Sequence, residues 1–209
     1  YGRSESELEI INEGAPVKGG DKLVLRNGYH GYVKLNNFIF TDWLTIEAEN
    51  GHTPVLSHFG IVGVFEKIYL KGLTVRKDSY VGDGNYWDNA TLNRNGSACF
   101  YLASSDYQDK GSHVKLNGLT VKTTENTSSW SAEDWVQRSA SGIYLRSVEY
   151  VEIVNCVVEN IRHGIAIEYH SDHSVAVNNT INNYSADGCR LISNDVLFSY
   201  NTITNCYDV

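Results

Sequence analysis

The chain has 209 residues, of which 42% are hydrophobic and 20% charged, and its formal net charge is −8. This composition excludes a disordered or collagen-like chain, and the acidic charge disfavours binding of a nucleic-acid backbone as the main activity. The longest apolar runs fall far short of the roughly 18 residues of a membrane helix, so no membrane partner is expected. One domain spanning residues 1–209 is the expected organisation.

Short apolar segments of one pattern recur along the chain. Each opens with an apolar residue, repeats one two positions later and closes with one seven positions later; they are 68–75, 114–121, 151–158 and 196–203. A fifth copy, 175–181, fits with one residue deleted. The closing residues Val158, Ile181 and Ile203 lie 23 and 22 residues apart, and strands around Gly142, Gly164 and Gly188 recur at a similar interval.

This repeat predicts an all-β fold, a parallel β-helix or β-solenoid with coils of about 22–24 residues. No segment sustains a helical period, and the winding is expected to be right-handed, as parallel crossovers are. Asn160, Asn183 and Asn205 fall at the same turn position of successive coils, which predicts an asparagine ladder.

Two coils are longer than the others, and their surplus predicts loop excursions near residues 78–97 and 123–140. The excursions contain Trp87, Trp130 and Trp135, which we predict to contact substrate, because aromatic rings beside a groove suit stacking on sugars. The alternative is that these rings pack back on the solenoid and fasten the loops.

The amino-terminal third carries motifs of a known superfamily. Gly20-Asp21-Lys-Leu-Val-Leu-Arg26-Asn-Gly28-Tyr29, Leu44-Thr-Ile-Glu-Ala48 and Lys71-Gly-Leu-Thr-Val75 resemble the opening coils of pectate lyase-like parallel β-helix proteins, above all the alginate lyase and chondroitinase B group. The resemblance implies the fold. Lyases of that group carry a catalytic Lys and Arg with acidic calcium ligands on late coils, and those motifs have no match here. Since the repeat leads us to expect another coil after Val209, we expect an amino-terminal portion of a longer protein.

Strand alternation places a mixed charged and aromatic patch on one outer face. We predict catalytic roles for Tyr144, Arg146, His170 and Arg190, and substrate contacts for Glu168 and Tyr101. Arg can neutralise a uronate carboxylate, and His or Tyr can accept the sugar C5 proton. Alternatively, Arg146 and Glu168 form an ordinary cross-coil ion pair. No metal ligands are assigned, since side chains around 170–173 diverge, while Ca²⁺ on other acidic turns remains open.

These features together predict binding and lyase-like depolymerisation of an extracellular, acidic polysaccharide. No cofactor is required. The alternative is a non-catalytic glycan-recognising viral tailspike or head spike, expected to be a homotrimer, or a surface adhesin; a purely structural solenoid is a third reading. Either main reading places the protein outside the cell or on a virion surface.

Overall fold

The computed structural model describes residues 17–79, 98–104 and 110–208. The first strands are β1 (Lys22–Leu25), β2 (Gly28–Tyr29), β3 (Tyr32–Ala48), β4 (Pro54–Leu56), β5 (His58–Lys71) and β6 (Thr74–Arg76). A 3-10 turn, η1 (Lys77–Ser79), precedes β7 (Ala98–Ala103), β8 (Gly111–Asn117) and β9 (Thr120–Lys122). The helix α3 (Ala132–Arg138) leads to β10 (Ser141–Arg146), β11 (Val148–Val154) and β12 (Val157–Ile161). The last strands are β13 (Ile165–Glu168), β14 (Val175–Val177), β15 (Thr180–Tyr184), β16 (Cys189–Ile192), β17 (Leu197–Ser199) and β18 (Thr202–Cys206).

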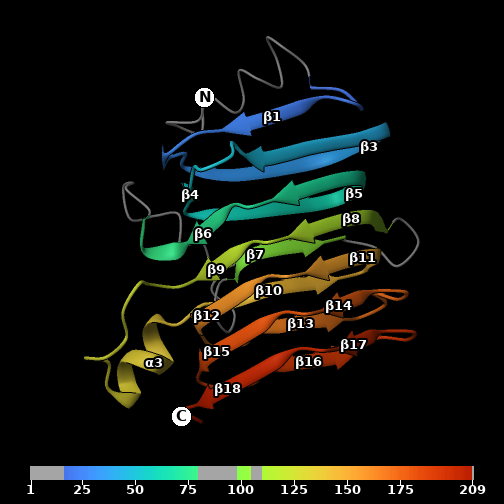
Figure 1. The fold of residues 1–209 in the computed structure, drawn as a ribbon. Helices are drawn as coiled ribbons and strands as arrows, with labels where there is room; N and C mark the ends of the chain where they lie inside the picture. Colours follow the sequence, from blue (N-terminus) through green and yellow to red (C-terminus); the bar gives the residue numbers. More distant parts are fainter. Residues whose placement is uncertain (1–16, 80–97, 105–109, 209) are drawn as a thin grey trace.

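The strands wind around one axis as stacked coils, which confirms the predicted β-solenoid (Figure 1). One parallel sheet runs in the order β16-β13-β10-β7-β5-β8-β11-β14-β17, and the other in the order β18-β15-β12-β9-β6-β4-β2. Later coils contribute three strands each, as in β10, β11 and β12. The long strand β5 bends, so that its first part pairs with β7 and its second part with β8.

The predicted coil register is confirmed along the second sheet. Val75 pairs with Val121, Val121 with Val158, Val158 with Ile181, and Ile181 with Ile203. The first four of these side chains are fully buried. One detail of the repeat was wrong: the fifth copy has no deletion.

Ser174, not Val175, takes the opening inward position of that copy. Glu152 pairs with Val175 and Ile153 with Ala176, so the preceding residue, Ser174, occupies the inward place. Ser174 is 0% exposed, and its hydroxyl donates to the Ser171 carbonyl at 2.9 Å. A polar residue with its own local acceptor can therefore fill an apolar position of the repeat.

The glycines of the recurring strand stack where coils approach closely. A Cβ on Gly142 would lie 2.6 Å from the Gly164 carbonyl oxygen, and one on Gly164 would lie 2.1 Å from that of Gly188. No side chain fits at such distances, which explains why glycine recurs there.

Left-handed residues mark the corners of the solenoid. Asn160, Asn183 and Asn205 have φ values of 54°, 52° and 58°, as their place in the repeat predicts. The ladder bond forms between the first two, since Asn183 donates to Asn160 at 3.2 Å. Asn205 donates instead to Asn182, at 2.7 Å.

The excursion at 123–140 contains the one α-helix of the described residues, which the repeat does not predict. Ser131 caps α3 by accepting a hydrogen bond from the Asp134 backbone at 3.2 Å, while the Asp134 side chain accepts from the Ser131 backbone at 2.9 Å. This reciprocal capping box is a known helix start signal. Residues 80–97 of the other excursion, including Trp87, lie outside the described residues.

Candidate functional site

The parallel register of four strands brings five of the predicted residues onto one outer face: Tyr101, Tyr144, Arg146, Glu168 and Arg190. Tyr101 on β7 pairs with Tyr144 on β10, and the row continues through Ala166 on β13 to Arg190 on β16. The flanking residues Ile143 and Leu145 are fully buried in the core. Since side chains alternate along a strand, the row itself points away from the core.

Glu168 is the centre of this face. It is only 1% exposed although it lies on the outward side of β13. The Tyr144 phenol donates to its Oε2 at 2.9 Å, and Nε of Arg190 lies 3.1 Å from its Oε1. The Tyr101 ring stacks on that of Tyr144 with centroids 5.6 Å apart. Glu168 therefore pairs with Arg190 of the next coil, and not with Arg146 as the cross-coil alternative expected.

The charged contacts continue to the corner before the strands. Nε of Arg190 also lies 3.4 Å from Oδ2 of Asp187, and Nδ1 of His163 lies 3.1 Å from the same oxygen. Burial lowers the pKa of His163, and the Asp187 carboxylate opposes that shift without reversing it. The charge of Arg190 is thus shared between two carboxylates.

The two tyrosines hold their protons. Burial raises the pKa of Tyr144, and the hydrogen bond and negative charge of Glu168 raise it further. Burial also raises the pKa of Tyr101, while the nearby charge of Arg146 partly lowers it. A tyrosine that accepts a proton from a sugar needs its pKa lowered instead. Both phenols are therefore suited to donate hydrogen bonds in this arrangement.

Arg146 differs from Arg190 in having no carboxylate partner within the described part of the chain. Its side chain is exposed, and its guanidinium carbon lies 4.7 Å from the ring centroid of Tyr169. His170 follows in the exposed turn after β13, with a φ of 63°. The tyrosine–arginine face is defined here as Tyr101, Tyr144, Arg146, Glu168, Tyr169 and Arg190.

The tryptophans of the 123–140 excursion pack on each other. Trp135 is 3% exposed, with the Trp130 ring 4.9 Å away edge-on and the Tyr207 ring stacked at 4.8 Å. The Arg138 guanidinium lies 5.0 Å from the Trp130 centroid. Trp135 has no open ring face for a sugar here, so its predicted substrate contact finds no support. The packing matches the alternative, in which the rings fasten the loop.

Three residues of this region were not singled out from the sequence. Asp187 and His163 precede their strands at the corner, where alternation does not tell which way a side chain points. Tyr169 follows β13 in a left-handed turn, with a φ of 49°. The sequence signal for Tyr169 was an aromatic side chain two positions after Ile167. The left-handed turn, however, breaks the alternation of inward and outward side chains that identified the other residues.

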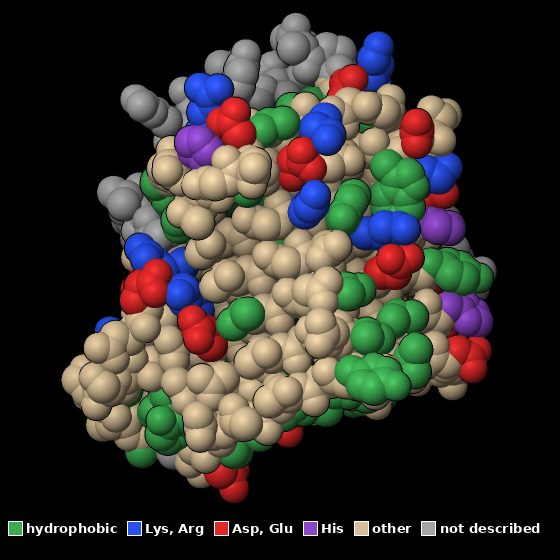
Figure 2. Space-filling model, viewed as in Figure 1, with side chains coloured by type: hydrophobic (Ala, Val, Ile, Leu, Met, Phe, Trp, Pro, Cys, Tyr) green, Lys and Arg blue, Asp and Glu red, His purple; other side chains and the backbone are tan. Residues whose placement is uncertain are grey.

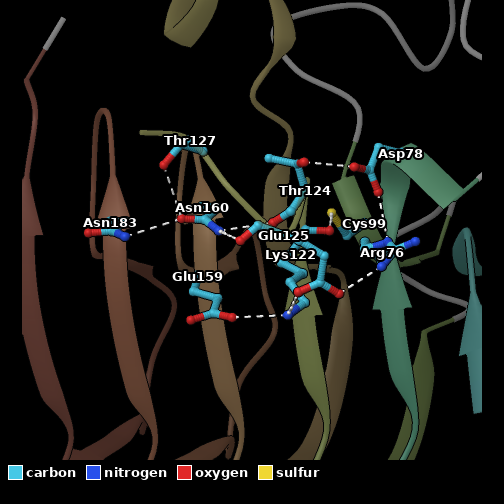
Figure 3. Close-up of polar contacts among 10 residues, drawn as sticks. All are labelled: Arg76, Asp78, Cys99, Lys122, Thr124, Glu125, Thr127, Glu159, Asn160 and Asn183. Atoms are coloured by element: carbon cyan, nitrogen blue, oxygen red, sulfur yellow. Dashed lines mark hydrogen bonds and ion pairs between the residues drawn. The ribbon is translucent and has the colours of Figure 1, made fainter. Parts of the chain in front are cut away.

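A second polar cluster lies outward of β6, β9 and β12, and we call it the Lys122 network (Figure 3). Nζ of Lys122 lies 2.7 Å from Glu125 and 3.2 Å from Glu159. Arg76 lies 2.7 Å from Glu125 and 2.8 Å from Asp78. Burial alone would lower the pKa of Lys122, but its hydrogen bonds to the two glutamates outweigh this and raise it. Each cation has carboxylate partners, so the network joins the excursion to the coils.

Aromatic rings also stack along another corner of the solenoid. Tyr150 lies between His113, at a centroid distance of 5.1 Å, and His173, at 5.0 Å. Figure 2 shows histidine side chains on either side of a hydrophobic one at the right-hand edge of the molecule. Because the rings cover each other's faces, the stack offers mainly ring edges to the solvent.

The described residues contain no group of three or more His, Cys, Asp or Glu side chains arranged to hold a metal ion. No helix among them is long and apolar enough to cross a membrane. The four cysteines are unpaired, and burial raises the pKa of Cys99 to about 12 and that of Cys156 to about 11. Such thiols are poor nucleophiles.

Comparison with protein-family models, curated proteins and solved structures gives no match for this chain. The class that the structure defines is therefore architectural: an all-β protein with parallel sheets wound into a β-solenoid.

Proposed function

We propose that the tyrosine–arginine face binds an acidic polysaccharide. The observation that carries the proposal is Arg146, an exposed cation without a carboxylate partner in the described ranges, beside stacked tyrosines on a rigid sheet. A guanidinium can hold a carboxylate or sulfate with two parallel hydrogen bonds. The net charge of −8 does not prevent this, because the field of distant charges is screened beyond about 8–10 Å.

The surroundings of Arg146 also fit a sugar. The phenol of Tyr101 keeps its proton and can donate to a sugar oxygen, while the phenol oxygen of Tyr144, whose proton is bonded to Glu168, can accept from a sugar hydroxyl. Aromatic rings also stack on the apolar faces of sugars. The motifs near Gly20-Asp21 and Gly72-Leu73 resemble the pectate lyase-like superfamily, above all the alginate lyase and chondroitinase B group, whose enzymes cleave acidic polysaccharides. We therefore favour uronic-acid polymers as the ligand class.

The geometry supports binding more than elimination. A lyase needs a base for the sugar C5 proton, and the protonated Tyr144 phenol donates a hydrogen bond to Glu168. Arg190, the second predicted catalytic cation, is occupied by Glu168 and Asp187. Lyase activity would require this cluster to rearrange around the substrate, and it remains the second candidate.

A binding panel with polygalacturonate, alginate, chondroitin and neutral dextran tests the proposal. The parent protein is expected to bind at least one acidic polymer and not dextran, and Arg146→Ala is expected to weaken that binding by about ten-fold or more. Arg138→Ala is the matched control, because it removes the same charge from α3. Equal loss in both variants, or no binding by the parent, would contradict the proposal.

Ultraviolet absorbance in the same mixtures distinguishes a lyase from a recognition protein. A lyase produces unsaturated uronate that absorbs in the ultraviolet, whereas a recognition protein leaves the polymer intact. Binding without absorbance would favour the recognition reading, and a stable homotrimer would then point to a spike.

A further inference from the structure

The corner after β13 holds one more residue than the corner after β10. Arg146 pairs with Glu168, 22 residues further on, whereas Glu152 pairs with Val175, 23 residues further on. Tyr169 and His170 are both left-handed, with φ values of 49° and 63°, where the preceding coil begins its corner with Ser147 alone, at 54°. An extra residue of this kind bends the chain and redirects side chains.

Tyrosine is a costly residue for such a position. Among the described residues, sixteen other than glycine have positive φ values, and eleven of these are Asn, Asp or His, the types that tolerate this conformation best. Tyr169 is one of the five exceptions. A strained residue persists only when something compensates it, and such residues gather at functional sites.

Packing in the core does not explain Tyr169. The residue is 41% exposed, although it is large and apolar. The contact that defines its surroundings is the guanidinium of Arg146, 4.7 Å from the ring centroid. An exposed ring is thus held in a strained turn beside a cation that has no described carboxylate partner.

We propose that Tyr169 is the sugar-stacking residue of the tyrosine–arginine face and orients Arg146 toward the carboxylate of the stacked sugar. This inference rests on the proposed function and names the ligand unit as a uronic acid. The C–H face of the sugar ring lies against exposed ring surface of Tyr169, while its carboxylate pairs with the guanidinium. One monosaccharide engages both side chains, because they are already in contact.

Two substitutions at Tyr169 separate binding from folding. Tyr169→Asn places a residue suited to positive φ there, so the midpoint of thermal unfolding should rise, while binding of polygalacturonate or alginate should weaken by about ten-fold or more. Tyr169→Phe keeps the ring and should bind within about three-fold of the parent. A stability gain together with an affinity loss is what a residue kept for binding predicts.

Tyr200→Asn is the matched control. Tyr200 has a φ of 53° and is 87% exposed, outside the tyrosine–arginine face. Its replacement should raise the unfolding midpoint in the same way and leave polysaccharide binding unchanged.

The outcomes distinguish a failure of the stacking role of Tyr169 from a failure of the proposed polysaccharide binding. If Tyr169→Asn binds like the parent while Arg146→Ala does not, the stacking role of Tyr169 is overturned and the proposed function stands. A lower unfolding midpoint in Tyr169→Asn would show that Tyr169 serves the fold, which also overturns the inference. If the parent binds neither polymer, the proposed function fails and this inference with it.

Discussion

The Lys122 network and the tyrosine–arginine face are both built from charged side chains on the outside of the solenoid, but their charges are arranged differently. In the Lys122 network, Lys122 and Arg76 each contact two carboxylates, and Glu125 joins them. On the tyrosine–arginine face, Arg190 also contacts two carboxylates. Arg146 instead lies over the Tyr169 ring and contacts no carboxylate of the described residues.

This difference separates charges that hold the fold from a charge that is available for a ligand. The Lys122 network lies where the 123–140 excursion leaves β9, and its contacts cross between loop and coil (Figure 3). Arg146 makes no comparable bridge within the described residues. The contrast should appear both in the stability of variants and in their binding of polysaccharide.

The largest effect on stability is expected at Glu168. Glu168→Ala leaves the Tyr144 phenol and Arg190 without their buried partner, and should lower the free energy of unfolding by about 2–3 kcal/mol. Glu125→Ala removes a carboxylate whose side chain is 56% exposed, and should cost about 1 kcal/mol or less. Urea unfolding of both variants measures the difference, and equal losses would contradict the central place of Glu168.

An intermediate effect is expected from the two cations. Lys122→Ala removes a side chain that is 11% exposed and sets two glutamates free, which should cost about 1–2 kcal/mol. Arg146→Ala removes an exposed side chain and one cation–π contact, which should cost about 0.5 kcal/mol or less. Polysaccharide binding should weaken in Arg146→Ala and stay unchanged in Lys122→Ala. An Arg146→Ala variant that is the less stable of the two would break the contrast.

The smallest effect is expected from acid on Glu125. Hydrogen bonds from Lys122 and Arg76 lower the pKa of Glu125 below the ordinary value of 4.5. The unfolded chain therefore takes up this proton first, so the contribution of Glu125 is present above pH 4.5 and is lost as the pH falls through the lowered value. The parent should exceed Glu125→Gln in stability at neutral pH, and the difference should disappear once the pH falls below the lowered pKa of Glu125. A difference that persists unchanged in acid would exclude this ion pair as its source.

The repeat made most of the fold predictable. Val121, Val158 and Ile181 were aligned correctly because period-2 alternation and a fixed coil length each point to the same inward positions. The alignment failed at Ser174, where a hydroxyl bonded to a local carbonyl replaces an apolar side chain. It also missed α3, because a helix of 7 residues is too short to show a sustained period, although Ser131 and Asp134 carry its capping box.

The candidate site was predictable only as a face. Alternation correctly placed Tyr101, Tyr144 and Arg190 outward, but it does not reveal that Glu168 would reach Arg190 diagonally in the next coil. Tyr169 was hidden because its position depends on the one-residue insertion in the corner. The burial of Trp135 was not predictable, because composition does not tell whether a loop folds back.

The most direct test compares one acidic polysaccharide with its carboxyl-reduced form. Reduction removes the carboxylates and keeps the sugar rings, so calorimetric titration of both polymers measures what the carboxylate contributes. We expect the parent to bind the acidic form at least about ten-fold more tightly, and Arg146→Ala to bind the two forms alike. Equal binding of both forms by the parent would contradict the account, because Arg146 would then have no role as the receptor for an acidic sugar.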